Sequence, residues 1–321
     1  MTQDIFVLIE HIRGQVSDIS YIMTAAAREL AQAQDGSVVG ILLGSGAENF
    51  KDNLAVDKVI YCDHAALAEF TSDAYKRTLI AILGEYDPRA VFFGNTTIGA
   101  DVSSSIAAHS SYPIINSCIR ITEGGGITSQ VCGGKIMVDS QLADKTTIVT
   151  MIPGGYKPEQ GQGGPPSETI KFSPPDLENL KVKMVQFIEP ATGDVDIAQE
   201  KILVAIGRGI QTEDNIELAE ELAALLGGTV CASRPVIDQG WLPTSRLVGK
   251  SGKSVKPDLY LSLGISGATE HLEGIMGSKT IVAINSDPDA PIFDIAKYGI
   301  EVDLFDFIDP LLEQLGNVKN G

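Results

Sequence analysis

The chain has 321 residues, of which 44% are hydrophobic and 21% charged, and its net charge is −18. This length predicts two domains, each large enough to bury a hydrophobic core. The acidic charge is spread along the chain without any basic block, which argues against nucleic acid or an anionic membrane as a partner. No apolar run approaches the ~18 residues of a membrane-spanning helix. The N-terminus carries no signal-peptide pattern, so we expect a cytoplasmic protein.

The four cysteines are scattered along the sequence and form no C-x-x-C pair. This spacing argues against a zinc site, an iron–sulfur cluster or a disulfide framework, and it favours a reducing compartment. We therefore expect no metal site and regard the thiols as structural. They are Cys62, Cys118, Cys132 and Cys231.

The first half of the chain alternates between short apolar runs and segments with helical periodicity. This alternation predicts a parallel sheet covered by helices. A region that alternates around glycine turns predicts an antiparallel hairpin instead. We expect strands at 5–9, 38–43, 59–61, 90–93 and 146–152, helices at 18–34, 72–85 and 101–109, and the hairpin at 119–140.

A glycine- and proline-rich segment, residues 153–175, follows these elements. Its composition excludes a helix or a central strand, so we expect an ordered surface loop or a linker. Residues 182–187 then resume a strand-like pattern. We place the domain boundary near Gly193, which gives an N-terminal α/β domain of residues 1–192 and a C-terminal domain of residues 193–321.

The second half begins another alternation of strands and helices. Together the halves predict an α/β fold of two domains, each a mostly parallel sheet with flanking helices. The C-terminal domain is expected to be Rossmann-like without the standard G-x-G-x-x-G turn. We expect strands at 202–206, 229–232, 259–263, 281–284 and 302–305, helices from Thr212 to Leu226 and at 272–276, 292–298 and 310–315, and a long non-helical region at 233–257.

The first strand of this half ends in Gly207-Arg208-Gly209, which resembles the start of a dinucleotide-binding turn. Thr212 stands in place of the third glycine, and we expect it to cap the next helix. The first helical turn would then carry Glu213 and Asp214, whose carboxylates complement the helix dipole and repel a pyrophosphate. We therefore expect no phosphate here, although Arg208 can lie against a planar or anionic ligand.

A better candidate for a phosphate-binding turn is the stretch 259–271. An apolar strand opens through small residues onto a helix start, which presents free backbone N–H groups and a positive dipole end. His271 follows about one helical turn later. The segment 249–253 lacks the spacing of a P-loop, but its glycine-flanked Ser251 hydroxyl can approach a ring edge.

Polar side chains follow several successive strands of the second half. Because open α/β sheets bind ligands at the carboxyl ends of their strands, we expect these side chains to converge on one rim. They are Arg208, then Ser233 and Arg234, and then Ser266 beside Gly267. Separately, Asn285 and Asp303 stand where ribose or adenine edges can be hydrogen-bonded.

Taken together, residues 202–312 resemble the flavin-binding domain of the electron transfer flavoprotein α subunit. The combination of motifs is highly specific, whereas the first half of the chain resembles this family mainly in its α/β order. The segments that carry the resemblance are 207–209, 232–234, 248–253, 264–268 with His271, and 280–305.

The resemblance implies that the C-terminal domain binds FAD. It implies that Arg234 lies over the isoalloxazine, that Ser251 donates to N5, and that His271 reaches O2, where a cation or donor stabilises an anionic reduced flavin. The other implied contacts are Ser233, Ser266, Gly267 and Ala268 at the pyrophosphate, Asn285 and Asp303 at the adenosine, Arg208 near the flavin, and Val248, Gly249, Lys250, Gly252, Glu270 and Leu304 elsewhere around the FAD.

Three positions depart from the usual pattern of this family. Ser251 stands where threonine is common, which keeps the hydroxyl. Lys250 and Glu270 each stand where glutamine is common, and they introduce opposite charges near one flavin. A cation raises the potential of a flavin that is reduced to an anion, and a carboxylate lowers it. We hypothesise that Lys250 and Glu270 form a compensating ion pair.

The resemblance further implies the α subunit of a heterodimeric electron carrier, with a β subunit docked on the N-terminal domain and no substrate turnover of its own. The implied donor is a flavoprotein dehydrogenase such as the acyl-CoA dehydrogenase of fatty-acid β-oxidation, and a quinone oxidoreductase or a ferredoxin is a further implied partner. An electron-bifurcating, NADH-dependent form is the alternative within the family. Outside it stand an NAD-dependent enzyme of sirtuin-like or deoxyhypusine-synthase-like fold and a plain nucleotide-binding module.

Overall fold

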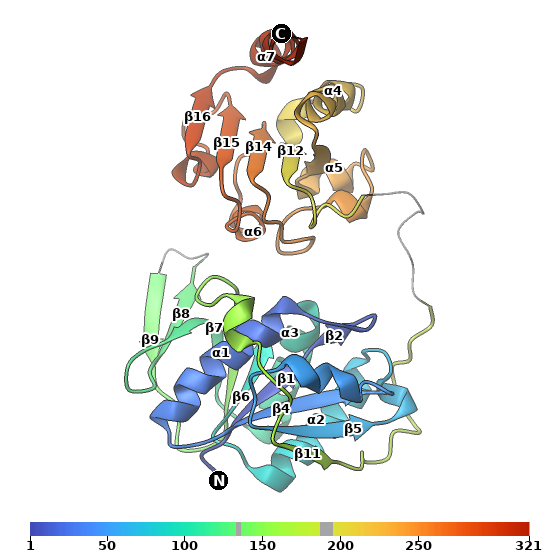
Figure 1. Cartoon of the computed structure of the whole chain (residues 1–321), viewed down its shortest axis with the longest axis vertical. Helices are drawn as coiled ribbons and strands as arrows, with labels where there is room; N and C mark the ends of the chain where they lie inside the picture. Colours follow the sequence, from blue (N-terminus) through green and yellow to red (C-terminus); the bar gives the residue numbers. More distant parts are fainter. Residues whose placement is uncertain (133–135, 187–194, 321) are drawn as a thin grey trace. The chain divides into compact units, whose positions relative to one another are not determined.

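The computed structural model describes residues 1–132, 136–186 and 195–320 of the chain. The chain forms two compact units, residues 1–187 and 188–321, and most of their helices and strands are labelled in Figure 1. The α/β class and the mostly parallel sheets predicted from the sequence are confirmed in both units. The expected boundary near Gly193 lies outside the described residues and stays a prediction.

The N-terminal unit is built on a nine-stranded sheet in the order β11-β5-β4-β1-β6-β10-β7-β8-β9. Neighbours from β11 to β7 are parallel, and β7, β8 and β9 pair antiparallel, as the hairpin pattern predicts. The central strands are continuous apolar runs because helices cover both faces. The strands are β1 (Ile5–Ile9), β4 (Val38–Gly44), β5 (Lys58–Asp63), β6 (Ala90–Gly94), β7 (Ile114–Ile121), β8 (Ile127–Val131), β9 (Ile136–Ser140), β10 (Thr147–Met151) and β11 (Glu168–Lys171), beside a small ribbon of β2 (His11–Ile12) and β3 (Gln15–Val16).

Two apolar cores flank this sheet. One contains the buried face of α1 (Asp18–Ala33), and the other contains the buried faces of α2 (Ser72–Tyr86) and α3 (Thr97–Ser110). The glycine- and proline-rich segment supplies only the edge strand β11 and one short turn, in agreement with its composition. The 3₁₀ turns are η1 (Glu48–Asn53), η2 (Ala65–Leu67) and η3 (Pro158–Gly161).

The strand expected at 182–187 is wrong over its described part, because residues 182–186 form no strand. A strand needs a neighbour to pair with, and β11 already occupies the sheet edge beside β5. The apolar side chains of this segment are consequently exposed; Val182, Met184 and Val185 are among them.

The C-terminal unit contains a five-stranded, fully parallel sheet in the order β13-β12-β14-β15-β16. Alternate side chains of its strands point into two cores. One core packs against α4 and α7, and the other packs against irregular segments and the single turn α6. The elements are β12 (Ile202–Ile206), η4 (Arg208–Ile210), α4 (Ile216–Leu226), β13 (Thr229–Ala232), α5 (Arg234–Asp238), η5 (Thr244–Arg246), β14 (Leu259–Leu263), α6 (Thr269–Glu273), β15 (Ile281–Asn285), η6 (Pro291–Asp294), β16 (Tyr298–Glu301) and α7 (Leu304–Asn320).

Two expectations about α4 are corrected. The helix begins at Ile216 with Asn215 as its N-cap residue, so Thr212 does not cap it. Glu213 and Asp214 lie in the turn before the helix and outside its first turn. The acidic character of the helix start is kept by Glu217, which does occupy the first turn.

The end of the chain differs most from expectation. The helix predicted at 292–298 is only the turn η6, because the chain must extend at 298–301 to pair with β15. The strand predicted at 302–305 is wrong, since α7 already begins at Leu304 and continues through Pro310. Earlier in the sequence, the region 233–257, expected to be non-helical, contains the short helix α5. The helix α6 begins three residues earlier than predicted.

Candidate functional site

The carboxyl ends of the C-terminal strands lie side by side, as the rim hypothesis requires. Ile206, the last residue of β12, is in register with Ala232 of β13 and Leu263 of β14. Leu263 is in turn in register with Ile284 of β15. The polar residues that follow these strands therefore start from one edge of the sheet.

The glycines of the first strand end have a packing role. A Cβ on Gly264 would lie 2.6 Å from Cα of Gly209, and a Cβ on Gly207 would lie 2.3 Å from the Gly264 carbonyl oxygen. Gly264 also has a φ of +62°, a conformation that glycine adopts without strain. Gly207-Arg208-Gly209 thus packs directly against the loop after β14, which explains its glycines without a phosphate.

The loop after β14 offers backbone donors. Within the part of the chain that the structure describes, the N–H groups of Ser266, Gly267 and Ala268 donate no backbone hydrogen bond. Gly267 has a φ of +87°, and a Cβ there would lie 2.4 Å from the Ile292 nitrogen. Because α6 is a single turn, these loop N–H groups rather than a helix dipole provide the anion-binding potential.

The loop of residues 248–253 is held between the sheet rim and α6. The Val248 N–H donates to the Ala232 carbonyl at 3.0 Å, and the Lys250 N–H donates to the Glu270 carbonyl at 2.7 Å. Gly249 has a φ of +130°, and a Cβ on Gly274 would lie 2.6 Å from its Cα. The structure therefore brings the Ser251 loop together with the segment that carries His271.

His271 is buried and packed against β14. Its Nε2 lies 2.8 Å from the hydroxyl oxygen of Tyr260, and the two ring centroids are 6.1 Å apart. Burial lowers the pKa of His271 to about 4, so the imidazole is neutral near pH 7, and the backbone of Val248 opposes this shift. Its Nδ1 is buried and has no hydrogen bond of normal geometry among the described residues.

The side chains of three more predicted site residues already have partners within the chain. Asp303 Oδ1 accepts from the Phe305 N–H at 2.9 Å and so caps α7. Asn285 Nδ2 donates to the Ile265 carbonyl at 2.9 Å. Arg234 pairs with Asp238 at 3.3 Å on the surface. Of the remaining residues, Arg208, Lys250, Ser251, Gly252, Ser266, Ala268 and Glu270 are exposed, whereas Ser233, Val248, Gly249, Gly267 and Leu304 are buried.

The hypothesis that Lys250 pairs with Glu270 is wrong in this structure. The Lys250 ammonium lies 3.6 Å from the carboxylate of Glu273, one helical turn farther along. The backbone carbonyl of Glu270 accepts from the Lys250 N–H at 2.7 Å. The backbone bond fixes the start of the Lys250 side chain, and from there the side chain reaches the carboxylate on the next turn.

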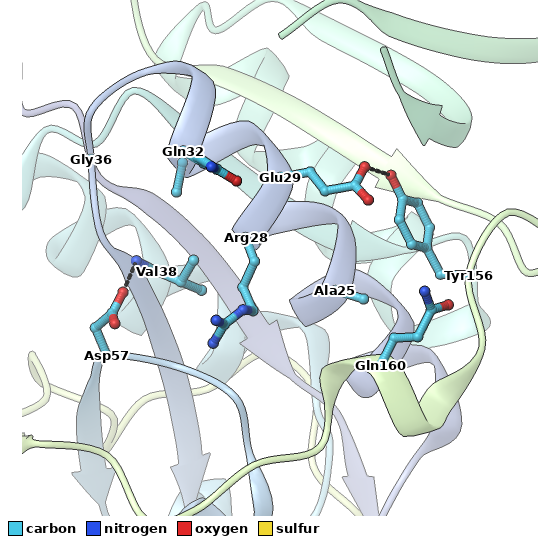
Figure 2. Close-up of a pocket in the computed structure, with 10 residues that line it drawn as sticks. Ala25, Arg28, Glu29, Gln32, Gly36, Val38, Asp57, Tyr156 and Gln160 are labelled. Carbon is cyan, nitrogen blue, oxygen red and sulfur yellow. Dashed lines mark hydrogen bonds between the residues drawn. The ribbon is translucent and has the colours of Figure 1, made fainter. Parts of the chain in front are cut away.

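The N-terminal unit contains a separate hollow of about 550 Å³ beside α1, shown in Figure 2. No predicted site residue lines it. Two of its carboxylates already have partners within the chain, since Glu29 accepts from the Tyr156 hydroxyl at 2.5 Å and Asp57 accepts from the Val38 N–H at 2.7 Å. The hollow therefore gives no sign of a ligand.

A buried carboxyl group, that of Glu10, lies at the carboxyl end of β1. It accepts from the Gly94 N–H at 3.2 Å and from the Thr96 hydroxyl at 2.8 Å. Burial raises its pKa from 4.5 to about 7, and these two hydrogen bonds oppose the shift. A Cβ on Gly94 would lie 2.6 Å from the Glu10 carboxylate, so glycine is needed there to make room.

Sequence reasoning missed both Tyr260 and Glu10. The only signal for Tyr260 is one aromatic hydroxyl in the strand Leu259–Leu263, which is otherwise leucine and serine. The only signal for Glu10 is a carboxylate directly after the apolar run of β1. Neither pattern identifies a partner: those of Glu10 lie more than 80 residues away, and the pairing of Tyr260 with His271, 11 residues along, depends on how the loop between them folds back.

Two further properties are those of the described residues alone. They contain no helix long and apolar enough to cross a membrane. They also contain no group of three or more His, Cys, Asp or Glu side chains placed to hold a metal ion.

Comparison with known proteins bears on both halves of the chain. A family described as "Electron transfer flavoprotein FAD-binding domain" matches residues 196–276, and one described as "Electron transfer flavoprotein domain" matches residues 5–177. The chain is 34% identical to the electron transfer flavoprotein subunit alpha of Thermoanaerobacterium thermosaccharolyticum, over 99% of each chain. It is 32% identical to the protein of the same name from Bacillus subtilis, over 98% of each chain. It is 30% identical to a subunit of the lactate dehydrogenase (NAD(+),ferredoxin) of Acetobacterium woodii, over 98% of this chain and 78% of that one.

Proposed function

The chain belongs to the electron transfer flavoprotein α-subunit family and binds FAD, and we propose that it carries electrons through this FAD from a flavoprotein dehydrogenase to a downstream acceptor. The proposed donor is an acyl-CoA dehydrogenase or a related flavoprotein, and the proposed acceptor is a quinone oxidoreductase or a ferredoxin. The protein is then a carrier that works as a heterodimer with a β subunit and turns over no substrate of its own.

The observation that carries the proposal is the assembly at the rim of the C-terminal sheet. The Ser251 loop is hydrogen-bonded to the segment of Glu270 and His271, beside N–H groups after β14 that donate no backbone hydrogen bond among the described residues. His271 presents a buried nitrogen, Nδ1, that lacks a normal hydrogen bond. An unpartnered buried polar atom is expected where a bound group completes the site. These residues fit the FAD that the family binds.

We propose a division of labour among these residues. The flavin supplies the redox chemistry, and the chain supplies orientation and electrostatics. The loop N–H groups with Ser233 and Ser266 hold the pyrophosphate, and Asn285 and Asp303 lie toward the adenosine. Around the isoalloxazine, Arg234 covers a face, Arg208 lies near the ring, Ser251 donates from its hydroxyl, and His271 donates at the pyrimidine carbonyl.

Absorbance of the purified heterodimer tests the function as a whole. A yellow preparation whose flavin is reduced by a dehydrogenase and reoxidised by an acceptor supports the carrier. A colourless preparation that takes up no added FAD refutes the proposal.

The role of Ser251 is tested by Ser251→Ala, with Ser254→Ala as the matched control three residues along the same exposed segment. One lost hydrogen bond of about 1 kcal/mol weakens FAD binding about fivefold. The flavin spectrum changes as well, because the lost donor faces the ring. Equal FAD affinity and equal spectra in the two variants would show that Ser251 does not contact the flavin.

The N-terminal unit supports the proposed β-subunit platform through its edge strand β9. Three consecutive apolar side chains of this strand, Ile136, Met137 and Val138, are 50%, 49% and 40% exposed. β9 is the last strand of the sheet, so its outer backbone groups lack a partner strand among the described residues. Soluble proteins normally protect such an edge, and an apolar unprotected edge indicates a protein partner.

Met137→Glu tests this platform. A charge in a docked apolar strand weakens the heterodimer at least tenfold, since burying an unpaired carboxylate is costly. Tyr298→Glu is the control, because Tyr298 is exposed on the edge strand β16 of the other sheet. Equal subunit affinities in the two variants, measured by ultracentrifugation, would remove β9 from the interface.

A bifurcating heterodimer is the second candidate, and the similarity to a subunit of an NAD(+)- and ferredoxin-dependent lactate dehydrogenase favours it. A plain carrier holds one FAD and a nucleotide per heterodimer, whereas a bifurcating form holds two FAD and oxidises NADH. Flavin counting on the purified complex separates the two. Family membership argues against the unrelated alternatives, a sirtuin-like or deoxyhypusine-synthase-like enzyme and a plain nucleotide-binding module.

A further inference from the structure

Among the described residues Tyr260 is the largest fully buried side chain, and it belongs to the core on one face of the C-terminal sheet. The hydroxyl lies 2.8 Å from Nε2 of His271. Such a polar pair in an apolar core is stable only if each member satisfies the other, because an unpaired buried hydroxyl or imidazole costs about 1–3 kcal/mol.

The direction of this hydrogen bond follows from the protonation states. Burial and the neighbouring Cys231 thiol keep the pKa of Tyr260 well above 10, so its oxygen keeps its proton. The imidazole is neutral near pH 7 and carries one proton on either Nε2 or Nδ1. If the hydroxyl donates to Nε2, the imidazole proton must be on Nδ1.

The groups at the two ends favour this direction. The Val248 backbone raises the pKa of the imidazole, and Nδ1 has no hydrogen bond of normal geometry among the described residues, so a proton on Nδ1 stays available to a bound group. On the other side, Tyr260 has the Cys231 thiol beside it, and sulfur is a weak acceptor for the hydroxyl proton. The imidazole nitrogen is the stronger acceptor.

We propose that Tyr260 is a positioning residue for His271: its hydroxyl donates to Nε2 and thereby holds the imidazole neutral with its proton on Nδ1. This inference rests on the proposed placement of His271 beside the FAD. The inference adds that His271 is a fixed N–H donor toward the flavin. It also excludes the imidazolium cation, which the sequence analysis left open as the group that stabilises the reduced flavin.

The tautomer can be read directly by ¹⁵N NMR on the FAD-loaded heterodimer with ¹⁵N-histidine in this chain. His271→Gln identifies the His271 signals among those of the four histidines. We expect a protonated Nδ1 and an unprotonated Nε2 in the wild type at pH 7. An imidazole protonated on Nε2, or on both nitrogens, would overturn the proposal without any need for a Tyr260 variant.

Tyr260→Phe removes only the hydroxyl. We expect the single tautomer to become a mixture, so that each ring nitrogen shifts toward an intermediate position. Tyr298→Phe makes the same change at an exposed site in the same unit and leaves the signals unchanged. Cys231→Ala removes the thiol beyond the hydroxyl and keeps the tautomer. Wild-type His271 signals in a folded Tyr260→Phe protein would refute the positioning role.

Reduction of the FAD separates this inference from the proposed function. If His271 does not contact the flavin, its Nδ1 signal does not move on reduction even though Tyr260 sets the tautomer. If Tyr260 has no positioning role, Nδ1 moves on reduction in the wild type and in Tyr260→Phe alike. The two hypotheses therefore fail with different spectra.

Discussion

The buried carboxyl group of Glu10 makes the stability of the N-terminal unit depend on pH. Burial raises its pKa from 4.5 to about 7, even though the Gly94 N–H and the Thr96 hydroxyl both bond to it. The folded state therefore binds a proton more tightly than the unfolded chain does. The stability that this proton contributes is fully present below pH 4.5 and is lost as the pH rises through 7.

The structure sets the size of this effect. Since one pKa unit corresponds to about 1.4 kcal/mol, the raised pKa corresponds to about 3 kcal/mol between low and high pH. Glu10→Gln keeps a neutral side chain of the same shape at every pH. We expect the variant to match the wild type at pH 4.5 and to exceed its unfolding free energy by about 3 kcal/mol at pH 8.5.

Hydrogen exchange of the β1 and α3 amides in urea, from pH 4.5 to 8.5 with correction for intrinsic rates, reports on this unit. The single tryptophan, Trp241, lies in the other unit and provides an internal reference. Glu123→Gln, at an exposed turn of the same unit, makes the same charge change as a control. A difference between wild type and Glu10→Gln that stays constant with pH would refute the reasoning.

Three further predictions concern single contacts. Gly267→Ala forces a side chain into a φ of +87° and against the Ile292 backbone, and it should lower the unfolding free energy seen by tryptophan fluorescence by at least about 2 kcal/mol; wild-type stability would contradict the close approach. Asp303→Ala removes the N-cap carboxylate of α7, which accepts from the Phe305 N–H. Without FAD, this variant should have an unfolding free energy about 1 kcal/mol below that of the wild type. An unchanged unfolding free energy would mean that the carboxylate does not cap α7. Cys132 is exposed and the other three cysteines are buried, so one thiol per native chain should react rapidly with a disulfide reagent. Cys132→Ser should abolish that reaction. A second fast-reacting thiol would show that a buried core opens.

The sequence predicted the sheets well because their signals are local. Continuous apolar runs such as Ile5–Ile9 and Ile202–Ile206 belong to strands that are buried on both faces, and the structure places each one in a parallel sheet. Errors appear where local pattern and pairing disagree. Residues 182–186 have a strand-like pattern but pair with no strand, whereas Tyr298–Glu301 is a strand because it pairs in parallel with β15.

By itself, the sequence determined that this is a two-part α/β protein, that polar residues follow the strands of its second half, and that small residues open the loop after Leu263. Chain order and side-chain type were enough for these conclusions, since parallel strands bring their carboxyl ends to one edge. The tertiary structure alone decided which groups contact each other there: Lys250 with Glu273 instead of Glu270, and His271 with Tyr260. Periodicity fixes the face of an element on which a side chain lies, whereas its partner depends on where a distant segment has packed. The protonation states of Glu10 and His271 depend on the same packing, because burial in the folded unit shifts their pKa values.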